Sequence, residues 1–231
     1  MKCLVLCGGK NTRMGDSYPK VLMPIKDKPL IVWVIEFWQK HGINEFVFLT
    51  GHHAEKVEPF IKDLPIKKQI VRGDGNLSFA CDVAKTEPYM GDKFIVAMAD
   101  CLNMGVFDSY ALENYRFGVG VIKAPKELIT INYGVSILDD QVSRVTEHPP
   151  AYMVRDYTWC GMGTFLMGKE IFDAIANTSV SGRTMKVEFI DAIQTLIDRN
   201  HEVYPLYFNG TYVNMNTPNE AQEIKKVMEA I

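Results

Sequence analysis

The first half of the chain alternates between two patterns of apolar and polar residues. Short, nearly continuous apolar runs bounded by glycine or aspartate are typical of strands buried on both faces of a sheet. Between these runs, apolar residues recur at helical spacing, and several such segments end at glycine or before proline. Ser78 is a candidate N-cap for one of them. We predict strands over Lys2–Cys7, Glu45–Thr50, Ile66–Val71, Lys93–Ala99 and Gly118–Lys123, and helices over Leu30–His41, His53–Lys62 and Ser78–Lys85.

The pattern changes in the second half, where strand-like segments follow one another without a helix between them. Two of these segments, Tyr133–Leu138 and Val142–Glu147, are separated only by the short loop Asp139–Gln141, which predicts an antiparallel hairpin. The other segments predict strands over Thr158–Met167, Val203–Phe208 and Thr211–Val213, and helices over Lys169–Ala176, Val187–Arg199 and Asn219–Ala230.

Strands that alternate with helices predict an α/β fold, with a Rossmann-like, mainly parallel sheet and helices on both of its faces. The hairpin region is then an antiparallel β region inserted into this sheet. The sequence contains no internal repeat, low-complexity tract or linker. We therefore predict a single domain over residues 1–231.

Composition limits the classes of partner. The 231 residues carry a net charge of −3, with 47% hydrophobic and 23% charged residues, as in an ordinary globular protein. There is no basic excess, so we expect no nucleic-acid partner. The apolar N-terminal stretch is too short for a signal peptide, and no run approaches the ~20 residues of a membrane span. The five cysteines are odd in number, widely spaced and without a CxxC pair, so we expect a reduced, cytoplasmic protein with no membrane partner.

The most informative segment follows the first strand and reads CGGKNTRMGDSYPKVLMPI. Gly8 and Gly9 allow backbone N–H groups to approach phosphate oxygens, and Lys10, Arg13 and Lys20 can neutralise phosphate charge. The spacing matches neither a Walker loop nor GxGxxG. Taken without the rest of the chain, the segment is also compatible with a turn that carries solvated charges.

Taken whole, this segment resembles the signature of the sugar-phosphate nucleotidyltransferases. Members of that family include glucose-1-phosphate thymidylyl- and uridylyltransferases and mannose- or heptose-1-phosphate guanylyltransferases. They usually show GGxGTR at the glycine loop. Here Asn11 stands where the middle glycine is expected, and asparagine tolerates a left-handed backbone better than most residues. The resemblance implies the nucleotide-diphospho-sugar transferase fold.

Further segments extend the resemblance over nearly the whole chain, in the family's order. Two of them resemble nucleotide-side motifs: the segment that packs on the base, and the strand that ends in a metal-binding aspartate. The others resemble motifs of the sugar side and of the C-terminal end. The segments are Gly75–Ala80 (GNLSFA), IVAMAD ending at Asp100, Asn132–Val135 (NYGV), Glu147–Pro150 (EHPP), Trp159–Phe165 (WCGMGTF), Phe189–Ile193 (FIDAI) and Tyr212–Ala221 (YVNMNTPNEA).

The resemblance implies an enzyme that joins a nucleoside triphosphate to a sugar 1-phosphate, giving an NDP-sugar and pyrophosphate. It implies that residues 1–125 bind the nucleotide, and that residues 126–231 form the sugar-phosphate part and the closing helix. Arg13 would contact the leaving pyrophosphate, and Lys20 the α-phosphate and the incoming sugar phosphate. Mg²⁺ is the implied cofactor. Its implied ligands are Asp100 and Asn214, the implied nucleotide-binding residues are Gly8, Gly9, Lys10, Asn11, Gly75 and Asn76, and the implied sugar-phosphate residues are Gly134, Glu147, His148 and Gly161.

Two positions depart from the family pattern. Asn214 stands where a second metal-binding aspartate is expected, and an amide brings no charge to the ion. His148 replaces a lysine and is only partly charged near neutral pH. These two positions leave open a non-catalytic regulatory subunit that binds a sugar nucleotide. A second alternative, a cytidylyl- or guanylyltransferase that acts on a non-sugar phosphate, stays open because RMG (Arg13–Gly15) followed by Pro19-Lys20 also resembles such enzymes. The sequence does not determine the base, the acceptor or the size of any homo-oligomer.

Overall fold

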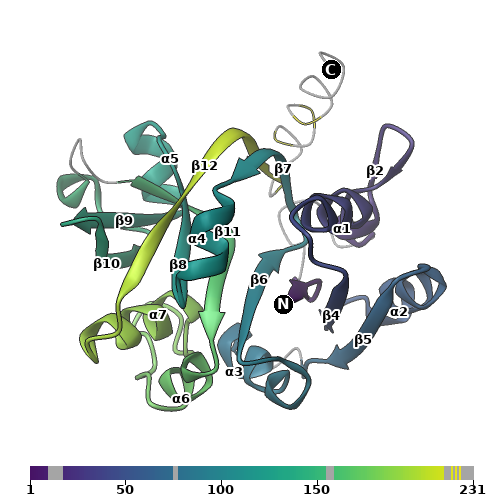
Figure 1. Ribbon diagram of the computed structural model, residues 1–231, viewed down its shortest axis with the longest axis horizontal. Coiled ribbons are helices and arrows are strands. Elements are labelled where there is room, and N and C mark those ends of the chain that lie inside the picture. Colours follow the sequence, from purple (N-terminus) through teal and green to yellow (C-terminus); the bar gives the residue numbers. More distant parts are fainter. Residues whose placement is uncertain are drawn as a thin grey trace.

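The computed structural model describes residues 1–9, 18–74, 78–154 and 159–215, together with residues 220, 222 and 224. Its main element is a ten-stranded sheet with the strand order β5-β4-β1-β6-β11-β8-β12-β7, to which β9 and β10 are attached through β11. Figure 1 shows this sheet running across the molecule, with helices on both sides. The architecture confirms the predicted α/β fold.

Four strands from the first half of the chain form a parallel block at one side of the sheet. In β1, Leu4 and Leu6 face one core while Cys3 and Val5 face the other. Burial on both faces explains why these runs are continuously apolar rather than alternating. The strands are β1 (Lys2–Leu6), β4 (Glu45–Thr50), β5 (Lys67–Arg72) and β6 (Lys93–Met98), close to their predicted bounds.

Helices cover both faces of the sheet, and their ends follow local signals in the sequence. The first helix ends just before Gly42, whose φ of 79° is a left-handed conformation that favours glycine. Ser78 is an N-cap as predicted, because its hydroxyl accepts a hydrogen bond from the backbone N–H of Cys81 at 3.1 Å. One face packs against α3 (Phe79–Ala84), α6 (Glu170–Ala176) and α7 (Phe189–Asp198), and the other against α1 (Leu30–Lys40), α2 (Ala54–Asp63) and α4 (Ser109–Asn114).

The second half of the chain contributes the antiparallel part of the sheet. Strand β11 (Trp159–Gly168) runs antiparallel between β6 and β8 (Phe117–Ile122). The predicted hairpin is β9 (Tyr133–Leu138) with β10 (Gln141–Glu147). Its turn residues Asp139 and Asp140 both have positive φ, at 49° and 61°, as a two-residue hairpin turn requires.

The end of the chain differs from the prediction. Val203–Phe208 and Thr211–Val213 belong to one continuous strand, β12 (Val203–Asn214), which pairs first with β8 and then with β7 (Cys101–Phe107). The predicted strands left out Asn209 and Gly210, but this glycine lies within the strand, where β12 passes close to β7. A Cβ at Gly210 would lie 2.2 Å from the backbone O of Met104, and a Cβ at Gly105 would lie 2.2 Å from that of Asn209.

Some elements were not predicted at all. Besides β7 and α4, these are α5 (Lys126–Ile131) and the two-residue strands β2 (Pro24–Ile25) and β3 (Lys28–Pro29). Most of the helix predicted over Asn219–Ala230 lies outside the described residues. In the part of the chain that the structure describes, no helix has the length and apolar character needed to cross a bilayer.

Candidate functional site

The carboxyl ends of β1 and β6 lie side by side, because the two strands pair in parallel. Gly8 and Gly9 follow β1, and Asp100 follows β6. Gly8 packs closely on the end of β4, where a Cβ at Gly8 would lie 3.3 Å from the backbone N of Gly51. In open α/β sheets, ligands bind beyond these carboxyl ends. The fold therefore puts the glycine loop and the aspartate where a ligand is expected.

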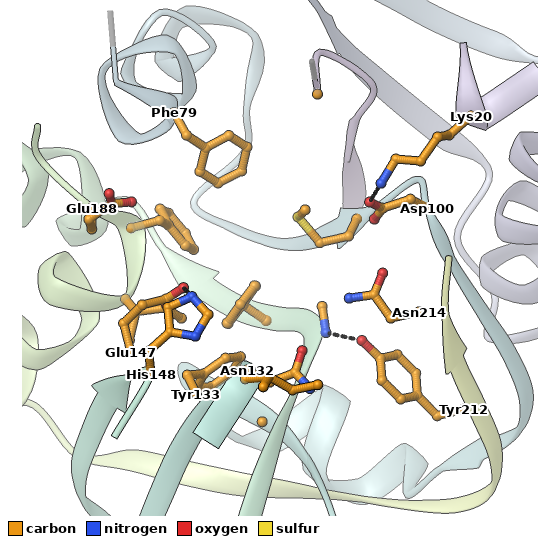
Figure 2. Close-up of a pocket in the computed structure, with 18 residues that line it drawn as sticks. Lys20, Phe79, Asp100, Asn132, Tyr133, Glu147, His148, Glu188, Tyr212 and Asn214 are labelled. Atoms are coloured by element: carbon orange, nitrogen blue, oxygen red, sulfur yellow. Dashed lines mark hydrogen bonds and ion pairs between the residues drawn. The ribbon is translucent and has the colours of Figure 1, made fainter. Parts of the chain in front are cut away.

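Lys20 and Asp100 form an ion pair at this edge. Lys20 begins a 3₁₀ turn, Lys20–Leu22, and its Nζ lies 2.7 Å from Asp100 Oδ2. The two side chains are only 11% and 14% exposed. Figure 2 shows the pair at one end of a pocket. Sequence analysis predicted a role for each residue separately, and the structure brings them into direct contact.

Two pockets share this ion pair in their lining. The central pocket has a volume of about 410 Å³, and the adjacent pocket about 240 Å³. Gly9, Lys20 and Asp100 line both of them. Of the other predicted residues, the central pocket takes in Glu147, His148, Gly161 and Asn214, and the adjacent pocket takes in Gly8.

Asn214 lies at the end of β12, close to Asp100. It pairs in register with Cys101, and the next backbone N–H, that of Met215, donates to the carbonyl of Asp100 at 2.8 Å. The Asn214 side chain points into the central pocket beside Tyr212 (Figure 2). Its Oδ1 is buried and has no hydrogen-bond partner among the described residues. A buried polar oxygen without a partner is costly, and a bound ligand is one way to satisfy it.

The donor set near Asp100 is compatible with a hard cation. The described residues contain no group of three or more His, Cys, Asp or Glu side chains that could hold a metal ion. What they offer here is one carboxylate, on Asp100, and the unsatisfied amide oxygen of Asn214. Mg²⁺ is commonly held by one or two protein oxygens together with waters and substrate phosphates. These two residues therefore fit the predicted ion.

Carboxylates also gather at the opposite end of the central pocket. Glu147 ends β10, and burial raises its pKa to about 7. Arg183 lowers that pKa in part, whereas Glu188 and Asp191 raise it. Arg183 lies 3.9 Å from Glu147 and 3.8 Å from Glu188, beyond ordinary hydrogen-bond distance. This end of the pocket is acidic, with one loosely placed arginine beside it.

His148 and Gly134 differ in their relation to the pocket. His148 lines it with a left-handed backbone, φ 47°, and its N–H donates to the carbonyl of Asn132 at 2.8 Å. Gly134 instead lies within the sheet, paired with Thr146 and Cys160, and is not among the described residues that line the central pocket.

Alanine at Gly161 is expected to lower the free energy of unfolding by about 1–3 kcal/mol. A Cβ there would lie 1.8 Å from Cε2 of the Tyr133 ring. That ring is buried, and its hydroxyl donates to the carbonyl of Met162, so it cannot easily move aside. Chemical denaturation of wild type and Gly161→Ala measures this difference in the free energy of unfolding. Gly182→Ala is the matched control because nothing lies within 4 Å of a Cβ there, and equal losses in the two variants would contradict the explanation.

Some predicted site residues lie outside the described residues. They are Lys10, Asn11, Arg13, Gly75 and Asn76, so their roles stay predictions. Conversely, sequence analysis assigned no role to several residues that line the central pocket. Five of these are aromatic side chains, whose only signal in the sequence is an apolar one. They include Phe79, Tyr133, Phe165, Phe189 and Tyr212, with the acidic Glu188 beside them.

Comparison with known proteins finds similarity over nearly the whole chain. Residues 3–104 match the family model of the MobA-like NTP transferase domain. The bifunctional protein GlmU of Methanocaldococcus jannaschii is 25% identical over 99% of this chain and 54% of its own length. The UTP–glucose-1-phosphate uridylyltransferase of Synechocystis sp. is 24% identical over 99% of this chain and 63% of its own length. Over nearly its whole length, the chain is similar to sugar-phosphate nucleotidyltransferases.

A solved structure gives the same result at the level of the fold. The crystal structure of UDP-glucose pyrophosphorylase complexed with UDP-glucose superposes with a TM-score of 0.86, covering 99% of this chain and 98% of that one at 19% identity. The chain spans between about half and two thirds of the length of the curated relatives named above. The resemblance stated from the motifs is thus confirmed.

Proposed function

We propose that the protein is a nucleotidyltransferase that transfers a nucleoside monophosphate from a nucleoside triphosphate to a sugar 1-phosphate. The observation that carries this proposal is the Lys20–Asp100 pair, held at 2.7 Å in the lining shared by the two pockets. A cation and a carboxylate fixed beyond the ends of parallel strands suit a place where two phosphate-bearing substrates meet. We assign the nucleotide to the adjacent pocket and the acceptor to the central pocket.

The chemistry asks mainly for positioning and charge neutralisation. A phosphate oxygen of the acceptor forms a bond to the α-phosphorus of the triphosphate. The bond from that phosphorus to the oxygen bridging to the β-phosphate breaks, and its electron pair leaves with pyrophosphate. Lys20 can turn its ammonium group from Asp100 to the phosphate oxygens and hold both substrates in line. At Gly9 nothing in the described chain lies within 4 Å of a Cβ, so the backbone after β1 leaves room there for the triphosphate to approach.

We also propose that Mg²⁺ is bound by Asp100 and Asn214 together with substrate phosphates. When bound, the ion would neutralise part of the negative charge that builds up on the transferring phosphate. The unsatisfied buried oxygen of Asn214 supports this assignment. Among the described residues, Asp100 is the one that brings a negative charge to such a site.

The test is a release assay. The purified protein is incubated with each nucleoside triphosphate, Mg²⁺ and a panel of phosphorylated acceptors, and pyrophosphate is measured. Release that requires one triphosphate and one acceptor together supports the proposal. The same panel decides between the two substrate classes. A non-sugar phosphate used in preference to every sugar 1-phosphate would favour a cytidylyl- or guanylyltransferase that acts on a non-sugar phosphate. Tight nucleotide binding without pyrophosphate release would favour the regulatory subunit, the alternative to which Asn214 and His148 point.

Asn214→Asp is expected to lower the Mg²⁺ concentration for half-maximal activity severalfold, because a carboxylate adds a full charge beside Asp100 where the amide offers a dipole. The gain is limited because the added charge also repels the substrate phosphates. Activity titrated against Mg²⁺ for both proteins checks the prediction. Asn44→Asp, at an exposed position, is the control and should leave the curve unchanged. Identical curves for wild type and Asn214→Asp would remove Asn214 from the metal site.

The cellular setting is part of the proposal. All five cysteines are free, and four of them are buried, which supports a reduced, cytoplasmic location. The proposed partners are the nucleoside triphosphate, the sugar 1-phosphate and, in a homo-oligomer, other copies of the chain. Sedimentation of the purified protein measures the last of these directly.

A further inference from the structure

The central pocket has two chemically different ends. Lys20, Asp100 and Asn214 lie at one end, where the phosphates are proposed to react. Glu147 and Glu188 lie at the other end, with His148 beside them. Figure 2 shows the two groups on opposite sides of the pocket. The second end should therefore contact the part of the acceptor that is remote from its phosphate.

A row of aromatic rings forms a wall of this pocket. The ring centroids of Phe79 and Phe189 are 6.0 Å apart, those of Phe189 and Phe165 are 5.2 Å apart, and those of Phe165 and Tyr133 are 6.0 Å apart. All four residues line the pocket. They come from α3, α7, β11 and β9, so the row exists only in the folded chain. Aromatic faces attract cations through the negative potential above the ring.

Acidic side chains gather beside this wall. The Glu147 and Glu188 side chains are 26% and 22% exposed, and Asp191 lies close enough to raise the pKa of Glu147. Among the described residues, Arg183 approaches both glutamates only to 3.8–3.9 Å and is 41% exposed, and the imidazole of His148 lies 3.6 Å from Glu147. Lys186 lines the adjacent pocket. Among the described residues that line the central pocket, Lys20 is the only lysine or arginine, and it lies at the opposite end.

We infer that the acceptor carries a positively charged amine, protonated or quaternary, at the end remote from its phosphate. This inference rests on the proposed function and names the class of acceptor. Neutral hydroxyl groups can be recognised by uncharged side chains, and an anionic body would be repelled by the two glutamates. A cation placed between the aromatic row and the carboxylates would instead be attracted by the ring faces and by the negative charge of the glutamates. Burial raises the pKa of Glu147 to about 7, so a bound cation should favour its ionised form and release a proton near that pH.

The first experiment compares matched acceptors. Pyrophosphate release is measured with glucose 1-phosphate and glucosamine 1-phosphate, which differ by one amine, and with phosphocholine and phosphoethanolamine. We expect kcat/KM for at least one amine-bearing acceptor to exceed that for glucose 1-phosphate by at least about tenfold. Comparing glucosamine 1-phosphate with phosphocholine and phosphoethanolamine shows whether the preferred acceptor is an amino sugar or a small phosphorylated amine. Equal values, or a preference for glucose 1-phosphate over every amine, would overturn the inference while leaving the transferase activity established.

The second experiment uses variants of the acidic end. Glu147→Gln and Glu188→Gln keep the shape of the side chain and remove its charge. Each should raise KM for the preferred amine-bearing acceptor by about tenfold or more and that for glucose 1-phosphate by much less. Glu113→Gln, exposed on α4, is the matched control and should change neither value. Equal effects of the pocket variants on both acceptors would mean that the glutamates bind hydroxyl groups rather than a cation.

A binding measurement keeps the inference separate from catalysis. Calorimetry with glucosamine 1-phosphate, phosphocholine and phosphoethanolamine, near pH 7 and in buffers of different ionisation heat, reports both affinity and proton release. We expect at least one of these amines to bind with a buffer-dependent heat that Glu147→Gln reduces. If no acceptor supports pyrophosphate release but such an amine still binds in this way, the transferase proposal fails and the cation site stands. If all three amines bind no better than glucose 1-phosphate, the cation site fails.

Discussion

Replacing Lys20 by methionine is expected to lower kcat/KM for pyrophosphate release by about 10²–10³-fold, the order of loss seen when one preorganised donor that stabilises transition-state charge is removed. Lys20 Nζ is held 2.7 Å from Asp100 in the lining of both pockets, so it is in place before either substrate arrives. It is needed most when two phosphates come together. The loss should therefore appear in kcat more than in KM for either substrate.

The same replacement also breaks a mostly buried ion pair, and a loss of folding has to be distinguished from a loss of chemistry. Breaking such a pair leaves a carboxylate poorly compensated and costs stability. Lys20→Arg keeps a cation at the position and should recover most of the stability, yet little of the rate, because its planar head cannot occupy the same point between two phosphates. Lys40→Met, at an exposed position on α1, is the control for methionine itself. Near-normal release by a folded Lys20→Met protein would remove Lys20 from the mechanism.

The parallel half of the fold could be predicted because its signals are local. Strands such as β1 and β6 are covered on both faces, so each appears in the sequence as one apolar run that ends at a glycine or an aspartate. The hairpin was equally readable, since Asp139 and Asp140 are residue types that tolerate the left-handed backbone its turn needs. In each case the information lies within a few residues of the element it specifies.

The elements that escaped prediction depend on contacts between distant segments. Gly210 lies between two strands that were predicted as separate, whereas it lets a single strand, β12, cross close to β7 at Gly105. Helix α5 follows Pro125 and buries only Ile129, so it shows no apolar stripe of the kind that identifies an amphipathic helix. Neither feature can be recognised without knowing which strand or loop lies opposite.

The functional site, like the fold, could be predicted only where its signals are local in the sequence. The motifs identified Lys20, Asp100, Glu147 and Asn214, each near the end of a strand or at the start of a turn. They could not reveal that Lys20 contacts Asp100, which is separated from it by 80 positions in the sequence, nor that Asn214 buries an oxygen without a partner among the described residues. The aromatic row was also hidden, because a phenylalanine in a strand or helix predicts a core position before it predicts a ligand.

Asp100→Asn is expected to lower turnover at saturating substrates by about 10²-fold or more, since it removes the only carboxylate that the described residues place beside Asn214 in the central pocket. The substitution keeps the shape of the side chain and the backbone contact, because the Asp100 carbonyl still accepts the N–H of Met215. The substitution also leaves the mostly buried ammonium of Lys20 without its partner carboxylate, which costs stability, so the free energy of unfolding is measured beside turnover to separate loss of charge from loss of folding.

Two side chains with amide oxygens would then face a cation that prefers charged oxygen ligands, so more Mg²⁺ should be needed for whatever activity remains. Activity titrated against Mg²⁺ measures this directly, and binding of Mn²⁺ in the presence of a nucleoside triphosphate provides a readout that does not depend on turnover. Asp63→Asn, exposed at the end of α2, is the control for the chemical change and should match wild type in both measurements.

Combining Asp100→Asn with Asn214→Asp moves the single carboxylate to the neighbouring strand. Partial recovery of Mn²⁺ binding by the double variant would mean that the two positions share one ion. If Asp100→Asn alone left the Mg²⁺ requirement and the turnover unchanged, the ion would have to be bound elsewhere, and Asp100 would serve only to hold Lys20.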